Sequence, residues 1–384
     1  MPKITIPFGQ PWIGQEERQA VLQVLDQPVL THGPQTHAFE EEFVSFAGGG
    51  YAVATSSCMG ALHLACWELG FGPGDDVIVP AQTHTATVHA IELMGSKPVF
   101  VDCDPRTGNM TAEAIRMALT PRTKGIVLVH FLGIPCEMDG ILSLAEEHGL
   151  KILEDCALAI GSTWKGIHVG LIGDAGAFSF YPAKHITTGE GGMLITRHRN
   201  LAESAVKRRG FGVDRAISER KIPGVYDVTM LGLNYRMSEI SAAIGRCQIK
   251  RIPAILALRQ KNAHTLISLL EELEGSSVLA STHPDGKETH YCVSLILPKS
   301  LRSKRSAIIL GLKEMEIGTS VYYPQPVPRM AYYREKYGYD SSVYSQAETI
   351  SDGSIALPVG PHLNESDMQH IADTLLGICR LHSK

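Results

Sequence analysis

One lysine in this sequence lies where glycines and small residues would let a ligand approach the backbone closely. Lys184 stands in FYPAKHITTGEGGM (180–193), directly after the apolar run GAFSF (176–180). Most lysines are solvated surface charges, but a lysine in a close-packed turn can act as a nucleophile toward a carbonyl carbon. Lys184 is therefore the first candidate for chemistry.

Two further stretches carry groups that could work with such a lysine. Asp155 follows the run KILE (151–154) and precedes the apolar CALAIG, so we expect a half-buried carboxylate that needs a positive partner or strong donors. In TSSCMGALHLA (55–65), Ser56 and Ser57 are natural N-caps of a helix whose free N–H groups can bind phosphate. Each feature alone has a plainer interpretation, as a solvated acid or a simple cap.

Alternating segments predict the scaffold for these groups. Short runs rich in β-branched and apolar residues are separated by helical patterns, which indicates a mainly parallel sheet with helices on both faces. In such sheets, ligands bind beyond the carboxyl ends of the strands. The predicted strands are 51–55, 76–80, 98–102, 125–130, 151–154, 176–180 and 192–196, and the helices between them are 59–69, 86–94, 112–119 and 139–147.

The pattern changes toward the C-terminus. We expect one helix ending near 252 and a longer connecting helix over 254–274, then strands over 290–298 and 317–324 of a partly antiparallel sheet. Helices over 305–315 and 365–381 complete this part. The sequence thus predicts an α/β domain with an N-terminal arm over residues 1–250 and a smaller α+β domain over 251–384.

Composition excludes several classes of protein. The 384 residues carry a net charge of −5 with both signs interspersed, so neither nucleic acid nor an anionic membrane is expected as a partner. No run reaches the roughly 20 apolar residues of a membrane helix, and no secretory signal pattern is present. The 8 cysteines form no C-x-x-C pair, and no histidine spacing suggests a metal site. We expect a reduced, cytoplasmic protein.

A phosphate cradle, a buried aspartate and a lysine in a pocket together describe a site for pyridoxal 5′-phosphate (PLP). In such a site the lysine bonds to the cofactor's aldehyde, and the carboxylate pairs with the ring nitrogen so that the ring can withdraw electrons.

At this point the chain resembles the DegT/DnrJ/StrS sugar aminotransferases, which have the fold type I of PLP-dependent transferases. The likeness runs along nearly the whole chain in order, through IPFGQPWIGQEE, LTHGP (30–34), SSCMGALHLA, PGDDVIVPAQTHTAT, KPVFVD, EDCALAIG, GDAGAFSFYPAKHITTGEGG, GLNYRM and ALPVGP. Single pieces are weak signals, whereas the ordered set is specific.

The resemblance implies a role for individual residues. Lys184 matches the lysine that bonds to the cofactor, and Asp155 matches the aspartate at the ring nitrogen. His84 stands at the place of the aromatic ring that stacks on the cofactor. Ser179 and the turn Ser57, Cys58 and Met59 match the phosphate contacts.

The resemblance also concerns a second subunit and the substrate. Asn234 in GLNYRM matches an asparagine that reaches the phosphate from the neighbouring subunit, which implies a homodimer with shared sites. From position alone, we expect Thr31, Tyr322 and Tyr323 to line the sugar side. No metal is expected.

Three residues depart from the family pattern. Met59 replaces a threonine of the phosphate turn, so a side-chain donor is lost. Leu158 replaces a glutamine or histidine near the cofactor's phenolic oxygen. Pro328 stands where a histidine is expected in VYYPQPVPRM (321–330). These departures concern cofactor affinity and the substrate pocket.

The resemblance implies a ping-pong transfer of an amino group from L-glutamate to a nucleotide-linked keto sugar. A keto-cyclitol acceptor stays open, as does another PLP enzyme of this fold, such as a lyase. A sugar 3-dehydratase is disfavoured, since that subgroup has histidine at the lysine position, whereas here His185 follows Lys184. A non-catalytic sensor on the same scaffold is disfavoured by the intact set of site residues.

Overall fold

A computed structural model describes residues 5–31, 33–214, 222 and 224–383 of the chain. Its centre is a seven-stranded sheet with the strand order β1-β9-β8-β5-β4-β2-β3. All seven strands were predicted from the sequence, to within two residues at either end. They are β1 (Tyr51–Thr55), β2 (Asp76–Pro80), β3 (Lys97–Val101), β4 (Thr123–Val129), β5 (Lys151–Asp155), β8 (Ala175–Ser179) and β9 (Gly192–Thr196).

The sheet is mainly parallel, as predicted. Strands β3, β2, β4, β5 and β8 pair in parallel, and β9 runs antiparallel between β8 and the edge strand β1. Because β9 is reversed, its first residue lies at the same edge of the sheet as the last residues of β1 and β8. Gly192 pairs with both Thr55 and Ser179. The start of β9 and the ends of β1 and β8 therefore lie together at this edge of the sheet.

Alternating residues of the strands bury two different cores. In β2, for example, Val77 and Val79 pack with α3, α4 and α7, whereas Ile78 packs on the other face with α2 and α6. Helices thus cover both faces, which requires strands that are apolar throughout. The helices of this part are α1 (Gln15–Leu25), α2 (Pro34–Ala47), α3 (Cys58–Glu68), α4 (Thr85–Leu93), α5 (Ala112–Met117), α6 (Met138–His148) and α7 (Arg199–Arg208).

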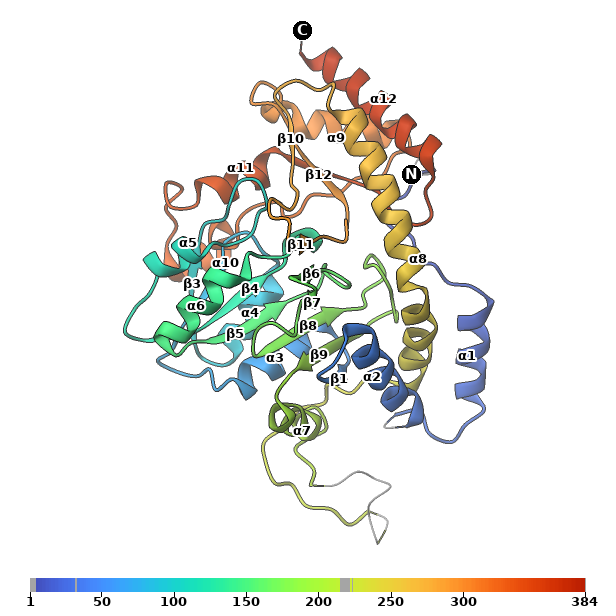
Figure 1. Ribbon diagram of the computed structural model, residues 1–384, viewed down its shortest axis with the longest axis vertical. Helices are drawn as coiled ribbons and strands as arrows, with labels where there is room; N and C mark the ends of the chain where they lie inside the picture. Colours follow the sequence, from blue (N-terminus) through green and yellow to red (C-terminus); the bar gives the residue numbers. More distant parts are fainter. Residues whose placement is uncertain (1–4, 32, 215–221, 223, 384) are drawn as a thin grey trace.

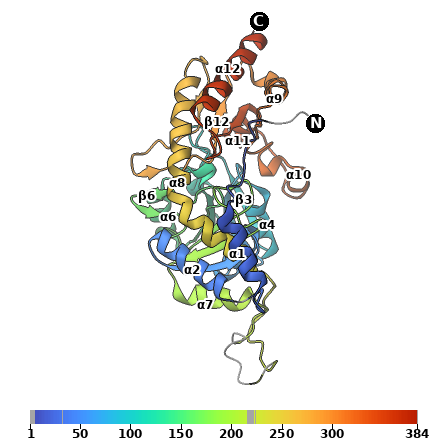
Figure 2. The same ribbon diagram turned by 90° about the vertical axis from the view of Figure 1, so that its right-hand side faces the viewer.

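One long helix, α8 (Glu239–Leu270), replaces the two helices predicted on either side of Pro253. A proline inside a helix costs about 3 kcal/mol, since it lacks an N–H group and its ring crowds the preceding turn. Here Ile249, Ile252 and Ile255 are buried in one core around the proline. Packing on both sides of Pro253 therefore outweighs its cost, and the helix runs from the large sheet to the C-terminal part (Figures 1 and 2).

The C-terminal part is built on a three-stranded antiparallel sheet, with β12 (Val293–Ile296) between β10 (Ser277–Val278) and β13 (Ser354–Leu357). The strand predicted over 317–324 is wrong. That segment makes only single bridges, from Ile317 to Ile6 and from Ser320 to Ala356, and then reaches two prolines. The helices here are α9 (Arg305–Glu314), α10 (Ala331–Tyr337), α11 (Ser345–Gly353) and α12 (Glu365–His382), with 3-10 turns η3 (Arg302–Lys304) and η4 (Val327–Arg329).

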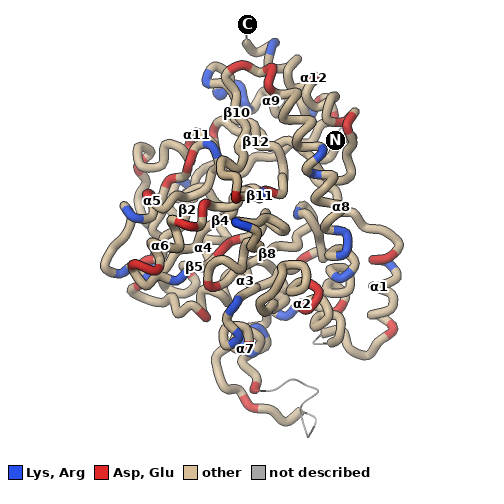
Figure 3. Tube along the Cα trace, viewed as in Figure 1, with Lys and Arg blue, Asp and Glu red and all other residues tan. Residues whose placement is uncertain are grey.

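Smaller elements complete the described chain. A small sheet joins β6 (Thr163–Trp164) to β7 (Ile167–His168) and β11 (Gly286–Lys287), and a 3-10 turn η1 (Phe131–Gly133) follows β4. Basic and acidic residues are interspersed along the trace (Figure 3). Within the described residues, no helix is both long enough and apolar enough to span a bilayer.

Candidate active site

The predicted cofactor residues converge at the edge of the sheet where the parallel strands end. Asp155 is the last residue of β5 and Ser179 the last of β8, whereas Ser57 and His84 follow β1 and β2. Parallel strands end at one edge, so the topology brings together residues far apart in sequence. The charges around Cys58 also indicate that these groups lie close together. Burial raises the pKa of the Cys58 thiol, the Asp155 carboxylate raises that pKa further, and Lys184 lowers it.

The turn before α3 has the form of an anion cradle. Ser57 is the N-cap of α3, and its Oγ accepts a hydrogen bond from the Gly60 N–H at 3.1 Å. The N–H groups of Cys58 and Met59 then lack an intrahelical acceptor and carry the positive end of the helix dipole. A Cβ atom at Gly192 would lie 2.4 Å from the Ser57 carbonyl carbon. Glycine at 192 therefore lets β9 close against this turn.

Asp155 is a buried carboxylate without a cation. It is 4% exposed, its Oδ2 accepts from the Thr87 hydroxyl at 2.7 Å, and its Oδ1 accepts from the Ala157 N–H at 3.0 Å. Within the described chain it forms no ion pair, although buried charges are normally paired. A cationic ring nitrogen would supply the missing partner, so this carboxylate fits PLP.

Thr87 is a functional candidate that the sequence analysis missed. Its hydroxyl donates to Asp155 and lies 2.8 Å from the Thr83 hydroxyl, one helical turn earlier. The spacing of the two threonines in PAQTHTAT, four residues apart, was a visible signal that both could lie on one face of a helix start. We infer that this pair orients the carboxylate of Asp155.

Lys184 lies in the loop between β8 and β9, as its glycine-rich setting predicted. Thr187 and Thr188 tie this loop back to Phe180, through Oγ1 at 2.9 Å and the N–H at 3.0 Å. Burial lowers the pKa of Lys184, while the nearby Cys58 and Asp155 partly offset that effect. A lysine amine of lowered pKa is present to a larger extent in the neutral form, which is the form that acts as a nucleophile or a base.

His84 and Ser179 complete the cofactor side. His84 caps α4, and its Nδ1 accepts from the Ala86 N–H at 3.1 Å. Burial lowers the pKa of His84, so the ring is largely neutral near pH 7. Among the described residues, the Ser179 Oγ has one long contact of 3.5 Å, from the Tyr181 N–H. Its hydroxyl is thus available to a phosphate.

The predicted substrate residues are only partly brought together. The Tyr323 ring lies 5.5 Å from the His84 ring, and the Tyr322 and Tyr323 rings are adjacent. Thr31 lies at the start of α2 and pairs with the backbone of Ser238. His32, within the predicted segment 30–34, lies outside the described residues.

Asn234 is exposed on the single chain and forms a backbone bridge to Gly210. The next residue, Tyr235, joins this segment to the turn at Ser57, since the Ser56 N–H donates to the Tyr235 carbonyl at 2.8 Å. Exposed apolar side chains lie nearby, among them Leu231, Leu233 and Phe211, whose N–H donates to the Leu233 carbonyl. A surface of this kind is typical of an interface between proteins.

The three departures from the family pattern lie in apolar surroundings. Met59 packs against the core cluster that includes α3 and α4, and Leu158 is buried with Phe131 and Leu132. Pro328 is buried in η4, whose Val327 N–H donates to the Ala81 carbonyl at 2.9 Å. Each replaces a polar group by apolar packing rather than leaving a gap.

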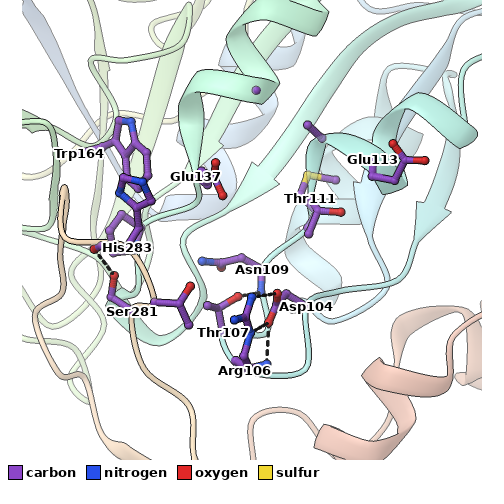
Figure 4. A pocket seen from close by; sticks show the side chains of 15 residues that line it. Asp104, Arg106, Thr107, Asn109, Thr111, Glu113, Glu137, Trp164, Ser281 and His283 are labelled. Atoms are coloured by element: carbon purple, nitrogen blue, oxygen red, sulfur yellow. Dashed lines mark hydrogen bonds and ion pairs between the residues drawn. The ribbon is translucent and has the colours of Figure 1, made fainter.

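A cavity of about 250 Å³ lies apart from these residues, between the segment after β3 and the loop at 281–283 (Figure 4). Trp164 and His283 stack on one side of it, with ring centroids 4.8 Å apart, and Arg106 pairs with Asp104 on another. Its polar groups thus largely satisfy one another, and none of the predicted site residues lines it.

A buried cluster of His130, Glu154 and Cys156 resembles a metal site but is already satisfied by protein groups. Glu154 accepts from His130 and from the N–H groups of Gly170, Ile172 and Gly173, while His130 Nδ1 accepts from the Cys136 N–H. The ligand atoms of His130 and Glu154 are therefore engaged in structural hydrogen bonds.

The fold, the lysine, the unpaired aspartate and the anion cradle define a PLP-dependent aminotransferase. Comparison with known proteins gives the same class of enzyme and identifies one family within it. The model of the DegT/DnrJ/EryC1/StrS aminotransferase family matches residues 11–376, and the chain belongs to this family.

Individual relatives agree over their full length. The spore coat polysaccharide biosynthesis protein SpsC of Bacillus subtilis is 36% identical over 380 residues, covering 98% of this chain and 97% of that protein. The Streptococcus pneumoniae protein Spr1654, solved in its PLP form, is 27% identical with a TM-score of 0.91, covering 98% of both chains. PseC of Helicobacter pylori, an aminotransferase of pseudoaminic acid biosynthesis, is 27% identical with a TM-score of 0.90, covering 97% of this chain and 98% of that one.

Proposed function

We propose that this aminotransferase moves an amino group from L-glutamate to the keto group of a nucleotide-linked keto-deoxy sugar. The product would be an amino sugar for a polysaccharide, glycan or natural product. The observation that carries the transamination is that Lys184, a lysine of lowered pKa, lies near Asp155, a buried carboxylate with no ion-pair partner among the described residues. Sugar as the acceptor is supported by the relatives that act in polysaccharide and pseudoaminic acid biosynthesis.

PLP, when bound, supplies an aldehyde that accepts amines and a ring that withdraws electrons from the carbon next to the amine. The N–H groups of Cys58 and Met59, with the hydroxyls of Ser57 and Ser179, would hold its phosphate. Asp155 would pair with its ring nitrogen, and Thr87 would fix the orientation of that carboxylate. His84 would lie against the face of the ring.

Lys184 has two roles in this proposal. Its amine would hold the cofactor's aldehyde until the donor binds. Once free, the amine would act as the base that takes the proton from the donor's Cα, and then as the acid that gives this proton to the cofactor side. It must be neutral for the first of these steps, and the burial that lowers its pKa favours the neutral form. The same steps in reverse would aminate the sugar.

The proposal includes two subunits and a cytoplasmic location. Asn234 would reach the phosphate of the partner's site, and the exposed apolar residues between 206 and 233 would be covered by the partner. The interface would therefore complete each active site. Tyr322, Tyr323 and Thr31 would line the side on which the sugar enters.

The test is the visible absorption spectrum of the purified protein with PLP, before and after L-glutamate is added without an acceptor. We expect the band of the lysine-bound cofactor to appear, to fade with glutamate, and to be absent in Lys184→Ala. A band that does not respond to L-glutamate would contradict this donor and favour a lyase or another amine. The absence of any band at saturating PLP would contradict the enzyme itself.

The acceptor is tested separately, with the cofactor already loaded with the amino group. Nucleotide-linked 3-keto and 4-keto deoxy sugars and a keto-cyclitol are added in turn, and the return of the original band is followed. Recovery with a nucleotide-linked sugar supports the proposal. Recovery with the cyclitol alone would replace the sugar by a cyclitol as acceptor.

A further inference from the structure

Lys184 has a neighbour that none of the sequence motifs indicated. Its Nζ lies 5.7 Å from the centre of the Tyr291 ring, within the range of a cation–π contact. In the described part of the chain, Nζ has neither a hydrogen bond nor an ion pair. The ring of Tyr291 thus contacts an amine that is otherwise influenced by the nearby Cys58 and Asp155.

Tyr291 is held by hydrogen bonds at its hydroxyl and at its backbone carbonyl. It is 3% exposed, and its hydroxyl lies 2.7 Å from the Tyr322 hydroxyl. Arg259 from α8 donates through Nη1 to the Tyr291 carbonyl at 2.8 Å, and its guanidinium lies 5.9 Å from the ring centre. Arg259 is itself buried and pairs with no carboxylate among the described residues. Its contacts are with the carbonyl groups of His290 and Tyr291 and with the Tyr291 ring.

The backbone around Tyr291 is in an unusual conformation. His290 has a φ of 47° and Leu132 a φ of 54°, values that residues with a side chain rarely adopt. The Tyr291 N–H donates to the Leu132 carbonyl at 3.3 Å, so the residue that follows His290 is bonded to Leu132. Strain of this kind persists where the surrounding structure enforces it, and it occurs often at functional sites. The ring of Tyr291, which comes directly after His290, lies beside Lys184.

Two further aromatic rings lie beside the Tyr291 ring. Phe8 from the N-terminal segment lies 6.2 Å from the Tyr291 ring, and the His185 ring lies 5.7 Å from it. A Cβ atom at Gly9 would be 3.7 Å from the Cα of Ala183, so the N-terminal segment passes directly beside the lysine loop. The flexible member of this arrangement is the Lys184 side chain, and the ring is fixed.

We propose that Tyr291 is a positioning residue for Lys184, whose ring holds the lysine amine beside the cofactor cradle whenever the amine is not bonded to the cofactor. The ring limits the rotamers of the lysine stem in either protonation state, and its negative face attracts the amine once the amine has taken the proton from Cα. Lys184 then returns to the donor's Cα from a defined place rather than from many. This inference rests on the proposed role of Lys184 as proton carrier, and it is independent of the identity of the sugar.

The contact is tested first in the apoprotein, without any reaction. Protein labelled with 13C at the lysine ε-carbon is compared by NMR with Lys184→Arg, which identifies the Lys184 signal. We expect the ε-protons of Lys184 to lie upfield of the other lysines, because of the ring current of Tyr291. They should stay there in Tyr291→Phe, which keeps the ring, and move to the common position in Tyr291→Leu. A Lys184 signal at the common position in the unsubstituted apoprotein would overturn the proposal, whether or not any variant folds.

The functional part is tested by the first half-reaction with L-glutamate. Tyr291→Leu should lower kcat about tenfold and change the donor KM less than about twofold, because the amine acts after the donor binds. Tyr291→Phe should stay within about twofold in both constants. Tyr332→Leu, an exposed tyrosine on α10, is the matched control.

An unchanged kcat in Tyr291→Leu, with the NMR signal moved, would show a contact without a role in the reaction and would overturn the positioning role. A failure of the proposed function looks different. In that case the unsubstituted protein shows no half-reaction with L-glutamate, while the Lys184 signal still lies upfield.

Discussion

The two sides of the proposed active site are built in different ways. The residues proposed to bind the cofactor lie at the ends of adjacent strands, so that Asp155, Ser179 and the turn at Ser57 are placed by the register of one sheet. The proposed substrate side is an irregular segment around Tyr322 and Tyr323, which is attached to its surroundings by single bridges and by side chains.

This difference separates what is common to the family from what distinguishes its members. A sheet edge has fixed spacing, so a few substitutions there would disturb a cofactor that all members bind. An irregular segment can change in shape at small cost to the fold. We therefore expect changes on the cofactor side to abolish or weaken every reaction, and changes on the substrate side to alter the choice of acceptor.

The largest effect is expected for Lys184→Ala. Without the amine, neither attachment of the cofactor nor proton transfer at Cα has a residue to perform it, so kcat should fall by about a thousandfold or more. Steady-state kinetics and the visible spectrum measure both effects. Lys299→Ala, at an exposed position, is the control. Substantial residual turnover would show that the cofactor side depends less on Lys184 than the site geometry implies.

Gly192→Ala should come next, since it acts on the sheet edge itself. The added Cβ would lie 2.4 Å from the Ser57 carbonyl carbon, so either β9 or the cradle must move. Overpacking of this kind costs about 1–3 kcal/mol, and we expect PLP affinity to fall about tenfold or more. Thermal unfolding and cofactor titration measure the two effects. Gly377→Ala in α12, where a Cβ meets nothing within 4 Å, should leave PLP affinity unchanged.

Thr87→Val should have an intermediate effect, because it removes the hydroxyl that donates to Asp155 and keeps the shape of the side chain. A lost hydrogen bond to a charged group costs about 1.5–3 kcal/mol, which corresponds to about ten- to a hundredfold in kcat/KM. Kinetics with L-glutamate measure it, and Thr87→Ser should restore most of the rate. If Thr87→Ser reacts as slowly as Thr87→Val, the hydrogen bond from the hydroxyl to Asp155 does not explain the loss of rate.

The smallest effect is expected for Tyr323→Phe on the substrate side. Cofactor affinity and the half-reaction with L-glutamate should stay within about twofold, while the KM of the sugar acceptor should rise a fewfold, since one hydrogen bond is worth about 1 kcal/mol. Cofactor titration in the same preparation serves as the internal control. A loss of cofactor affinity as large as that of Gly192→Ala would remove the distinction between the two sides.

The sequence predicted the strands at whose ends the proposed cofactor residues lie, because strands buried on both faces are continuous apolar runs and glycines mark the turns between them. It failed where tertiary contacts decide the outcome. Nothing local shows that packing would carry α8 through Pro253, or that 317–324 would form bridges instead of a strand. The division of the chain between residues 250 and 251 stays a proposal, and α8 crosses it.

Individual residues show the same limit. Lys184 and Asp155 were recognisable from their own surroundings in the sequence. Thr87 could have been found from its spacing to Thr83. Tyr291 could not, because its position depends on Arg259 from α8 and on the φ angle of His290. Contacts between distant segments leave no periodic signal in either partner.

The reversed strand β9 has a consequence for the order in which the protein can assemble during synthesis. In the described sheet, the edge strand β1 pairs with β9, although well over a hundred residues separate them, and Thr55 and Ser56 also bond to the backbone of Arg236 and Tyr235. A growing chain therefore cannot complete the pairing of β1, or the contacts of the turn at Ser57 that follows it, until Arg236 has left the ribosome. By then Asp155, Ser179 and Lys184 have all emerged. The phosphate cradle and the lysine thus become ordered together, late in the synthesis of the sheet, and a nascent chain that ends before β9 has no place to hold the cofactor.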